Sequence, residues 1–118
     1  MTVAVQAFSI PQGDDMDVGF TVDPADNISL VGATVTWQAF PMSYAVPATP
    51  PIIIKSSAVS GEITVLDSPG NFIVHLLAAD TAALYCGNYY HEAEILDASQ
   101  YRATVCQGAM AVTLALIP

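Results

Sequence analysis

The residues that decide the fold are DTAALYCGNYYHEAE, positions 80–94. Asp80 is placed to cap a helical turn at Thr81–Tyr85, because a carboxylate accepts the free backbone N–H groups at the start of a helix. Gly87-Asn88 then reverses the chain, and a strand begins with Tyr89-Tyr90. A helical turn, a tight turn and a strand in this order are typical of small β-sandwich domains.

Outward from this stretch, short segments with alternating apolar residues are separated by Gly, Pro, Asn and Asp. That pattern predicts an all-β sandwich of eight or nine strands, with one short helical turn near residues 80–85. The length of 118 residues fits a single domain, 1–118. The predicted strands are Val3–Ile10, Met16–Val22, Ala33–Phe40, Ile52–Lys55, Glu62–Leu66, Phe72–Leu77, Tyr89–Leu96, Tyr101–Gln107 and Ala109–Ile117, the last led by Gly108.

Trp37 is the only tryptophan and lies in the middle of a predicted strand. Side chains alternate between the two faces of a strand, so Trp37 shares a face with Val35 and Ala39. We expect this face to pack between the two sheets, with Trp37 as its largest member.

The composition is unusually apolar: 53% of the residues are hydrophobic and 11% are charged. About 25% charged residues is typical of soluble domains, so either a membrane span or burial against partners would account for the difference. No run reaches the roughly 20 apolar residues of a spanning helix, and the amino terminus has no signal-peptide pattern. Burial against other subunits is therefore the favoured interpretation, with a monomer covered by uncharged polar residues as the alternative.

The net charge of −9 includes only two cations, Lys55 and Arg102. Two basic residues do not provide the footprint that a phosphate backbone requires, so we expect no nucleic-acid binding. The acidic balance also argues against an anionic membrane surface. Cys86 and Cys106 are expected to be free thiols, with a bridge between neighbouring strands as the alternative.

The sequence offers no convincing catalytic site, metal site or cofactor site. His91 and the carboxylates Glu92 and Glu94 lie on opposite faces of one predicted strand. The acidic residues at 14, 15 and 17 fit a solvated turn better than a calcium loop. His75 is expected to be a buried, hydrogen-bonded side chain, and no nucleophile triad is visible in the sequence. We therefore expect no enzymatic activity, no metal and no cofactor.

Several segments, which together cover most of the chain, resemble immunoglobulin-like domains of tailed-phage virion proteins, including amino-terminal domains of baseplate and tail accessory proteins. The longest are Leu30-Val31-Gly32-Ala33-Thr34-Val35-Thr36-Trp37, and Asp80-Thr81-Ala82 followed by Tyr89-Tyr90-His91-Glu92-Ala93-Glu94. Shorter matches are Gly13-Asp14, Asp97, Thr104-Val105 and Gly108. The resemblance implies an immunoglobulin-like antiparallel sandwich. A partial likeness to antibody variable domains adds the hypothesis of a tyrosine corner at Tyr89 or Tyr90.

The resemblance also implies a structural component of a virion, made in the bacterial cytoplasm. Its expected partners are other virion proteins and copies of itself. One alternative is a module that binds carbohydrate on a host surface, with Tyr44, Tyr85 and Tyr101 as possible contacts. The other is a capsid decoration protein.

We expect contacts with partners at three places, since edge strands and long loops commonly bind neighbours. The loop Pro41–Pro51 either binds a partner or simply blunts a sheet edge with its prolines. For the apolar strand we predict that Ile53→Asp abolishes incorporation into particles and leaves the fold intact. The candidate contacts are Tyr44 and Val46 in the loop, Ile52, Ile53 and Ile54 in the apolar strand, and Val112, Leu114 and Leu116 in the last strand.

Overall fold

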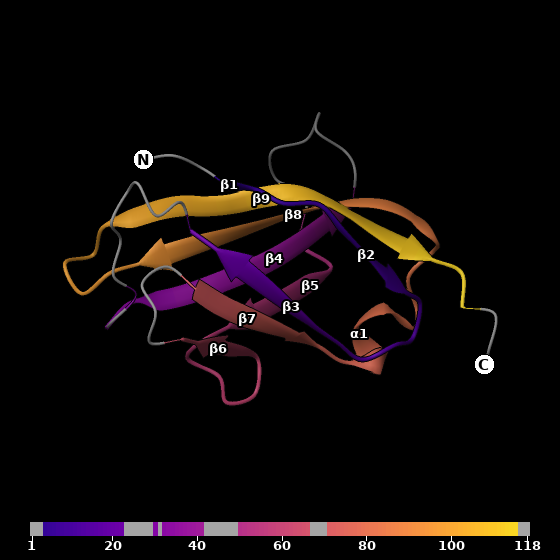
Figure 1. Ribbon diagram of the computed structural model, residues 1–118, viewed down its shortest axis with the longest axis horizontal. Coiled ribbons are helices and arrows are strands. Elements are labelled where there is room, and N and C mark those ends of the chain that lie inside the picture. Colours follow the sequence, from indigo (N-terminus) through magenta and orange to yellow (C-terminus); the bar gives the residue numbers. More distant parts are fainter. Residues whose placement is uncertain (1–3, 23–29, 31, 42–49, 67–70, 116–118) are drawn as a thin grey trace.

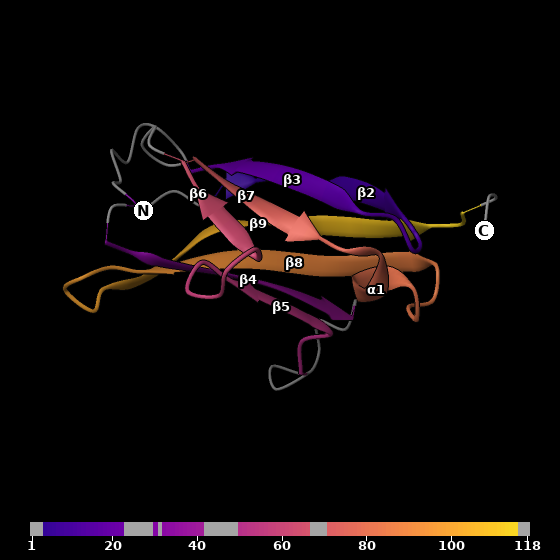
Figure 2. The same cartoon turned by 90° about the horizontal axis from the view of Figure 1, so that it is seen from below.

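The computed structural model describes residues 4–22, 30, 32–41, 50–66 and 71–115. It is an all-β sandwich of two facing sheets, as the sequence predicts (Figures 1 and 2). The larger sheet has the order β1-β9-β8-β4-β5, with β2 also on β9, and the smaller sheet has the order β3-β7-β6. The elements are β1 (Ala4–Val5), β2 (Phe8–Pro11), β3 (Met16–Thr21), β4 (Thr34–Pro41), β5 (Ile53–Ser56), β6 (Ile63–Val65), β7 (Asn71–Leu76), α1 (Ala78–Thr81), β8 (Gly87–Leu96) and β9 (Arg102–Thr113).

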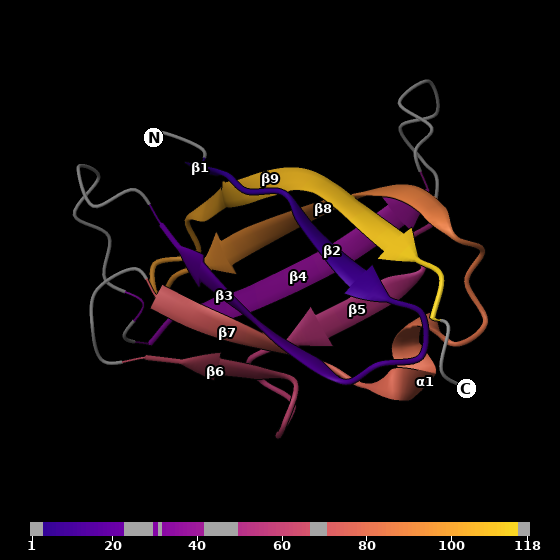
Figure 3. The ribbon, with the colours of Figure 1, turned by 45° about the vertical axis from the view of Figure 1, so that its right-hand side comes forward.

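Strands β3, β7 and β6 form one layer, and β9, β8, β4 and β5 form the other (Figure 3). Their pairings are antiparallel. The first segment is an exception, because β1 and β2 both run parallel to β9.

The core follows the period of two that the strands show in the sequence. In β4 the side chains of Val35, Trp37 and Ala39 are fully buried, and the residues between them are half-buried on the opposite face. Trp37 lies between the sheets, in contact with the rings of Phe8 and His91. The position predicted for Trp37 is therefore the observed one.

The two ends of the chain differ from the prediction. Gly108 does not lead a separate last strand, because β9 runs without a break from Arg102 to Thr113. Its pairing with β8 shifts register once: Ala93 pairs with Cys106 and Glu94 with Thr104, so Val105 of β9 is the extra residue of a β-bulge. The predicted first strand, Val3–Ile10, is instead divided into β1 and β2.

The helical turn also begins earlier than predicted. Helix α1 covers Ala78–Thr81, so Asp80 lies within it and does not cap a turn at Thr81–Tyr85. Its Oδ2 atom accepts a 2.7 Å hydrogen bond from the Leu77 N–H, just before the helix. The Ala78 N–H donates to Asp15 Oδ1 at 2.7 Å, so a residue from the turn before β3 satisfies the first helical donor.

Candidate docking surface

The candidate contact residues divide according to the face on which their strand places them. Ile52 and Ile54 are exposed, with 36% and 55% of their surface accessible, and Leu114 is exposed as well. Ile53 and Val112 belong to the hydrophobic core, at 5% and 2%, so they are not contact residues. Tyr44, Val46 and Leu116 lie outside the described residues.

The burial of Ile53 also overturns the mutation predicted from the sequence. Placing a charge at a core position costs several kcal/mol because the carboxylate loses its hydration. We therefore expect Ile53→Asp to unfold the domain. The residue that tests docking at this strand is Ile54, which points to the opposite side.

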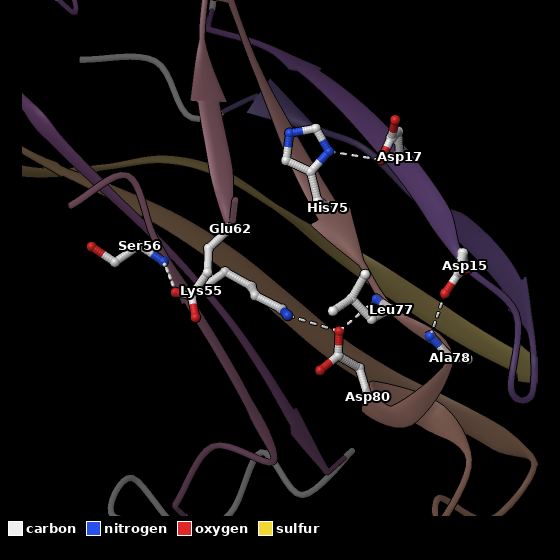
Figure 4. A network of polar contacts seen from close by, with 9 residues as sticks. All are labelled: Asp15, Asp17, Lys55, Ser56, Glu62, His75, Leu77, Ala78 and Asp80. Carbon is white, nitrogen blue, oxygen red and sulfur yellow. Dashed lines mark hydrogen bonds and ion pairs between the residues drawn. The ribbon is translucent and has the colours of Figure 1, made fainter. Parts of the chain in front are cut away.

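Strand β5 forms one edge of the larger sheet, and one of its backbone groups is already occupied. The Ser56 N–H donates to Glu62 Oε1 at 2.9 Å (Figure 4). A carboxylate on an edge donor discourages another strand from pairing there. Addition of a partner strand to β5 is therefore less favourable than contact through the side chains of Ile52 and Ile54.

Lys55, on the inward side of β5, forms an ion pair within the sandwich. Its Nζ atom lies 2.8 Å from Asp80 Oδ2, and the two side chains are 8% and 20% exposed (Figure 4). The same Asp80 oxygen accepts the Leu77 N–H. One of the two cations of the chain thus joins β5 to α1 and is not available to a partner.

We call the side of the larger sheet that faces away from the smaller sheet the outer face. It carries polar, charged and apolar side chains. Figure 2 shows no described helix or strand covering it. A hollow of about 40 Å³ lies near its centre, lined by Thr36, Gln38, Glu92 and Glu94. The outer face includes Thr36, Gln38, Phe40, Ile54, Tyr90, Glu92, Glu94, Leu96, Arg102, Thr104 and Gln107.

Both glutamates of the outer face have uncharged cross-strand neighbours. Glu92 lies between Gln38 and Gln107, which it faces in β4 and β9. Glu94 lies between Thr36 of β4 and Thr104 of β9. An exposed antiparallel sheet gains stability when opposite charges face each other, and these cross-strand positions do not provide such pairs.

The polar contacts of the outer face are mostly hydrogen bonds. The Tyr90 hydroxyl lies 2.9 Å from Gln107 Oε1 and 3.2 Å from Glu92 Oε2. Arg102 Nε lies 3.6 Å from Glu94 Oε1, and 66% of the arginine side chain is exposed. That pair is long and solvated, so it contributes little stability.

His91 lies under β1 and β2 and is fully buried. The Trp37 indole N–H donates to Nδ1 at 3.2 Å, and Nε2 lies 2.6 Å from the Gln6 carbonyl oxygen. A carbonyl only accepts, so the proton is on Nε2 and the imidazole is neutral. Burial lowers the pKa of His91, which the hydrogen bond to Gln6 opposes in part. Both ring nitrogens have partners, so the role of His91 is to hold the first segment of the chain.

His75 joins three strands of the smaller sheet, a contact that sequence reasoning missed. Its Nδ1 lies 2.7 Å from Asp17 Oδ1 in β3, and its Nε2 lies 2.7 Å from Thr64 Oγ1 in β6. Its side chain is 26% exposed rather than buried. The order carboxylate, imidazole, hydroxyl is that of a hydrolytic triad. However, Asp17 is 70% exposed and Thr64 is exposed on a sheet face, where water competes for both, so the geometry fits a clamp across strands.

The tyrosines predicted to form a tyrosine corner or a sugar-binding site lie at different places in the fold. The Tyr89 hydroxyl donates to the Tyr85 carbonyl at 2.6 Å, which is the kind of upstream contact a tyrosine corner makes. The Tyr85 and Tyr101 rings are exposed, but Tyr85 precedes β8 and Tyr101 follows it. A strand of ten residues spans about 34 Å, so these two rings do not form one sugar-binding platform.

Cys86 and Cys106 are free thiols, the first exposed and the second buried. Among the described residues, no three potential metal ligands gather at one place. The described part of the chain also has no helix long and apolar enough to cross a membrane. Comparison with protein-family models found no match, and neither did comparison with curated proteins.

Proposed function

We propose that this chain is a structural component of a tailed-phage or phage-like particle and acts by docking onto neighbouring subunits. The observation that carries the proposal is the side-chain surface at the edge of the larger sheet. There Ile52 and Ile54 are exposed beside Phe40 and Tyr90 of the outer face, whose ring centroids are 6.3 Å apart. Apolar and aromatic groups of this kind supply most of the binding energy of protein interfaces.

The setting in a particle rests on the sequence resemblance. The segments that carry it are Leu30–Trp37, Asp80–Ala82 and Tyr89–Glu94. The strand order of the sandwich supports the immunoglobulin-like class to which the resemblance points. A shared fold does not determine function, which depends on the particular surface residues of each protein. For this chain we propose that those residues are the exposed Ile52 and Ile54 at the edge of the larger sheet.

The experiment compares two substitutions, each introduced into the genome that encodes this chain, in the particles that this genome produces. Ile54→Asp places a charge at the proposed contact, and Val59→Asp places one at a turn residue with 50% exposure. We expect quantitative mass spectrometry to find the wild type and Val59→Asp at a fixed number of copies per particle, and Ile54→Asp to be depleted at least about tenfold. The copy number also separates a head position from a tail position.

Absence of the wild-type chain from purified particles, while it accumulates in the cell, would refute the particle assignment. Equal incorporation of Ile54→Asp and the wild type would refute docking through this edge. Both variants should first show the wild-type urea unfolding midpoint, since each substitution replaces an exposed side chain.

A further inference from the structure

We infer that the outer face binds a basic protein surface, whose lysine or arginine side chains lie against Glu92 and Glu94, and that it does not bind a second copy of this chain. The inference rests on the proposed function in one respect only, that docking takes place. It adds the chemistry of the partner and the side chains that recognise it.

The first reason is the position of the two carboxylates. Glu92 and Glu94 are two residues apart on β8 and point to the same side, so their backbones are about 7 Å apart. Their charges repel, the facing residues in β4 and β9 are neutral, and the long, solvated contact of Glu94 with Arg102 offsets the repulsion only slightly. A cation from a partner would relieve this repulsion at the hollow that the two carboxylates line.

The second reason is the shortage of cations in the chain itself. Lys55 is enclosed in its ion pair with Asp80, and Arg102 lies beside Glu94. A second copy with a net charge of −9 would bring its own acidic residues and almost no positive charge. Like-charge contacts at an interface cost several kcal/mol, so complementarity selects a basic partner.

The third reason is the uncharged polar side chains that line the hollow beside the two carboxylates. Thr36 and Gln38 line the same hollow and offer hydroxyl and amide groups to the N–H donors of a lysine or arginine. Ile54 faces Gln38 from the edge strand, so the apolar contact of the proposed function is continuous with the acidic centre. An interface with a few central charges and apolar flanks fits a protein surface better than a small cation.

The test is an NMR titration of the uniformly ¹⁵N-labelled full chain with the peptide acetyl-Lys-Val-Lys-Val-Lys-amide. We expect amide shift changes to concentrate on β4, β8 and β9 around Gln38 and Glu92. The double variant Glu92→Gln/Glu94→Gln should bind about fivefold to tenfold more weakly. The matched control Asp14→Asn/Asp17→Asn changes the net charge by the same amount on other surfaces and should bind within about twofold of the wild type.

Two results would overturn the inference. One is an equal loss of binding in the control variant, or shift changes spread over all acidic residues, because binding would then follow net charge alone. The other is concentration-dependent dimerisation in light scattering that Glu92→Gln/Glu94→Gln alters, because a second copy would then occupy the face. The particle experiment is independent of both, so its failure would remove the particle assignment and leave the basic-partner inference standing.

Discussion

Gly108→Ala should destabilise the domain strongly, because the missing side chain makes room for the first segment of the chain. A Cβ at this position would overlap the Gln6 carbonyl group and lie 3.2 Å from His91 Nε2. To avoid the overlap, Gln6 must move away from β9. Its N–H would then lose the 2.8 Å hydrogen bond to Gln107, and His91 would lose its 2.6 Å acceptor.

The magnitude follows from these two contacts. Each lost hydrogen bond costs about 1 kcal/mol, and a buried donor left without an acceptor costs a further 1–3 kcal/mol or so. The total is about 3–5 kcal/mol. With a urea m-value of about 1.5 kcal/mol/M, the unfolding midpoint should fall by roughly 2–3 M.

The assay is equilibrium urea unfolding followed by the fluorescence of Trp37. The matched control is Gly19→Ala, because a Cβ on Gly19 in β3 meets nothing within 4 Å. We expect that control to be neutral, or more stable by up to about 1 kcal/mol through the unfolded state. An unchanged midpoint for Gly108→Ala would refute the argument that the glycine is required by close approach.

Three further predictions concern buried ionisable groups. Burial lowers the pKa of His91, so the stabilisation from the neutral imidazole should be complete above pH 6.5. Below pH 6.5 it should decline by at most about 1.4 kcal/mol per pH unit. Urea unfolding of the wild type and of His91→Gln at pH 7.5 and 5.5 measures this loss of stability. Asp80→Asn should destabilise the protein by about 3 kcal/mol in urea unfolding, because it leaves the Lys55 cation buried without a counter-charge. A thiol reagent at pH 8 should modify the exposed Cys86 within minutes and reach Cys106 only after denaturation, because burial raises the pKa of Cys106 to about 11; rapid modification of both thiols in the native protein would contradict this.

Period-two alternation was enough to predict the sandwich and the inward face of β4, including Trp37. The alternation did not help at Ile52–Ile54, where every residue is apolar and the pattern does not say which one faces the core. The structure places Ile53 inside because it pairs with Ala39 on the buried face of β4. A short apolar run at a sheet edge therefore needs its pairing partner before its surface residues are known.

The other errors come from contacts between residues distant in the sequence. Gly108 was interpreted as the start of a strand, a local role, whereas its reason is Gln6, about a hundred residues earlier in the chain. The hydrogen bonds that join Asp17, His75 and Thr64 form because β3, β7 and β6 are neighbours in the smaller sheet. No short sequence motif encodes that strand order. Such contacts become visible only when the register of the sheets is known.

The distribution of charge connects the fold to the proposed docking. Lys55 joins β5 to α1 inside the sandwich, where its charge serves the fold and is largely shielded from solvent. The carboxylates of the outer face have weaker contacts in the fold: Glu92 accepts from the Tyr90 hydroxyl, and Glu94 lies in a long, solvated pair with Arg102. Repulsion between them lowers the stability of the isolated domain slightly and discourages contact between identical copies. A positively charged partner would remove both unfavourable terms, so the basic-peptide titration tests the docking chemistry that we propose for this face.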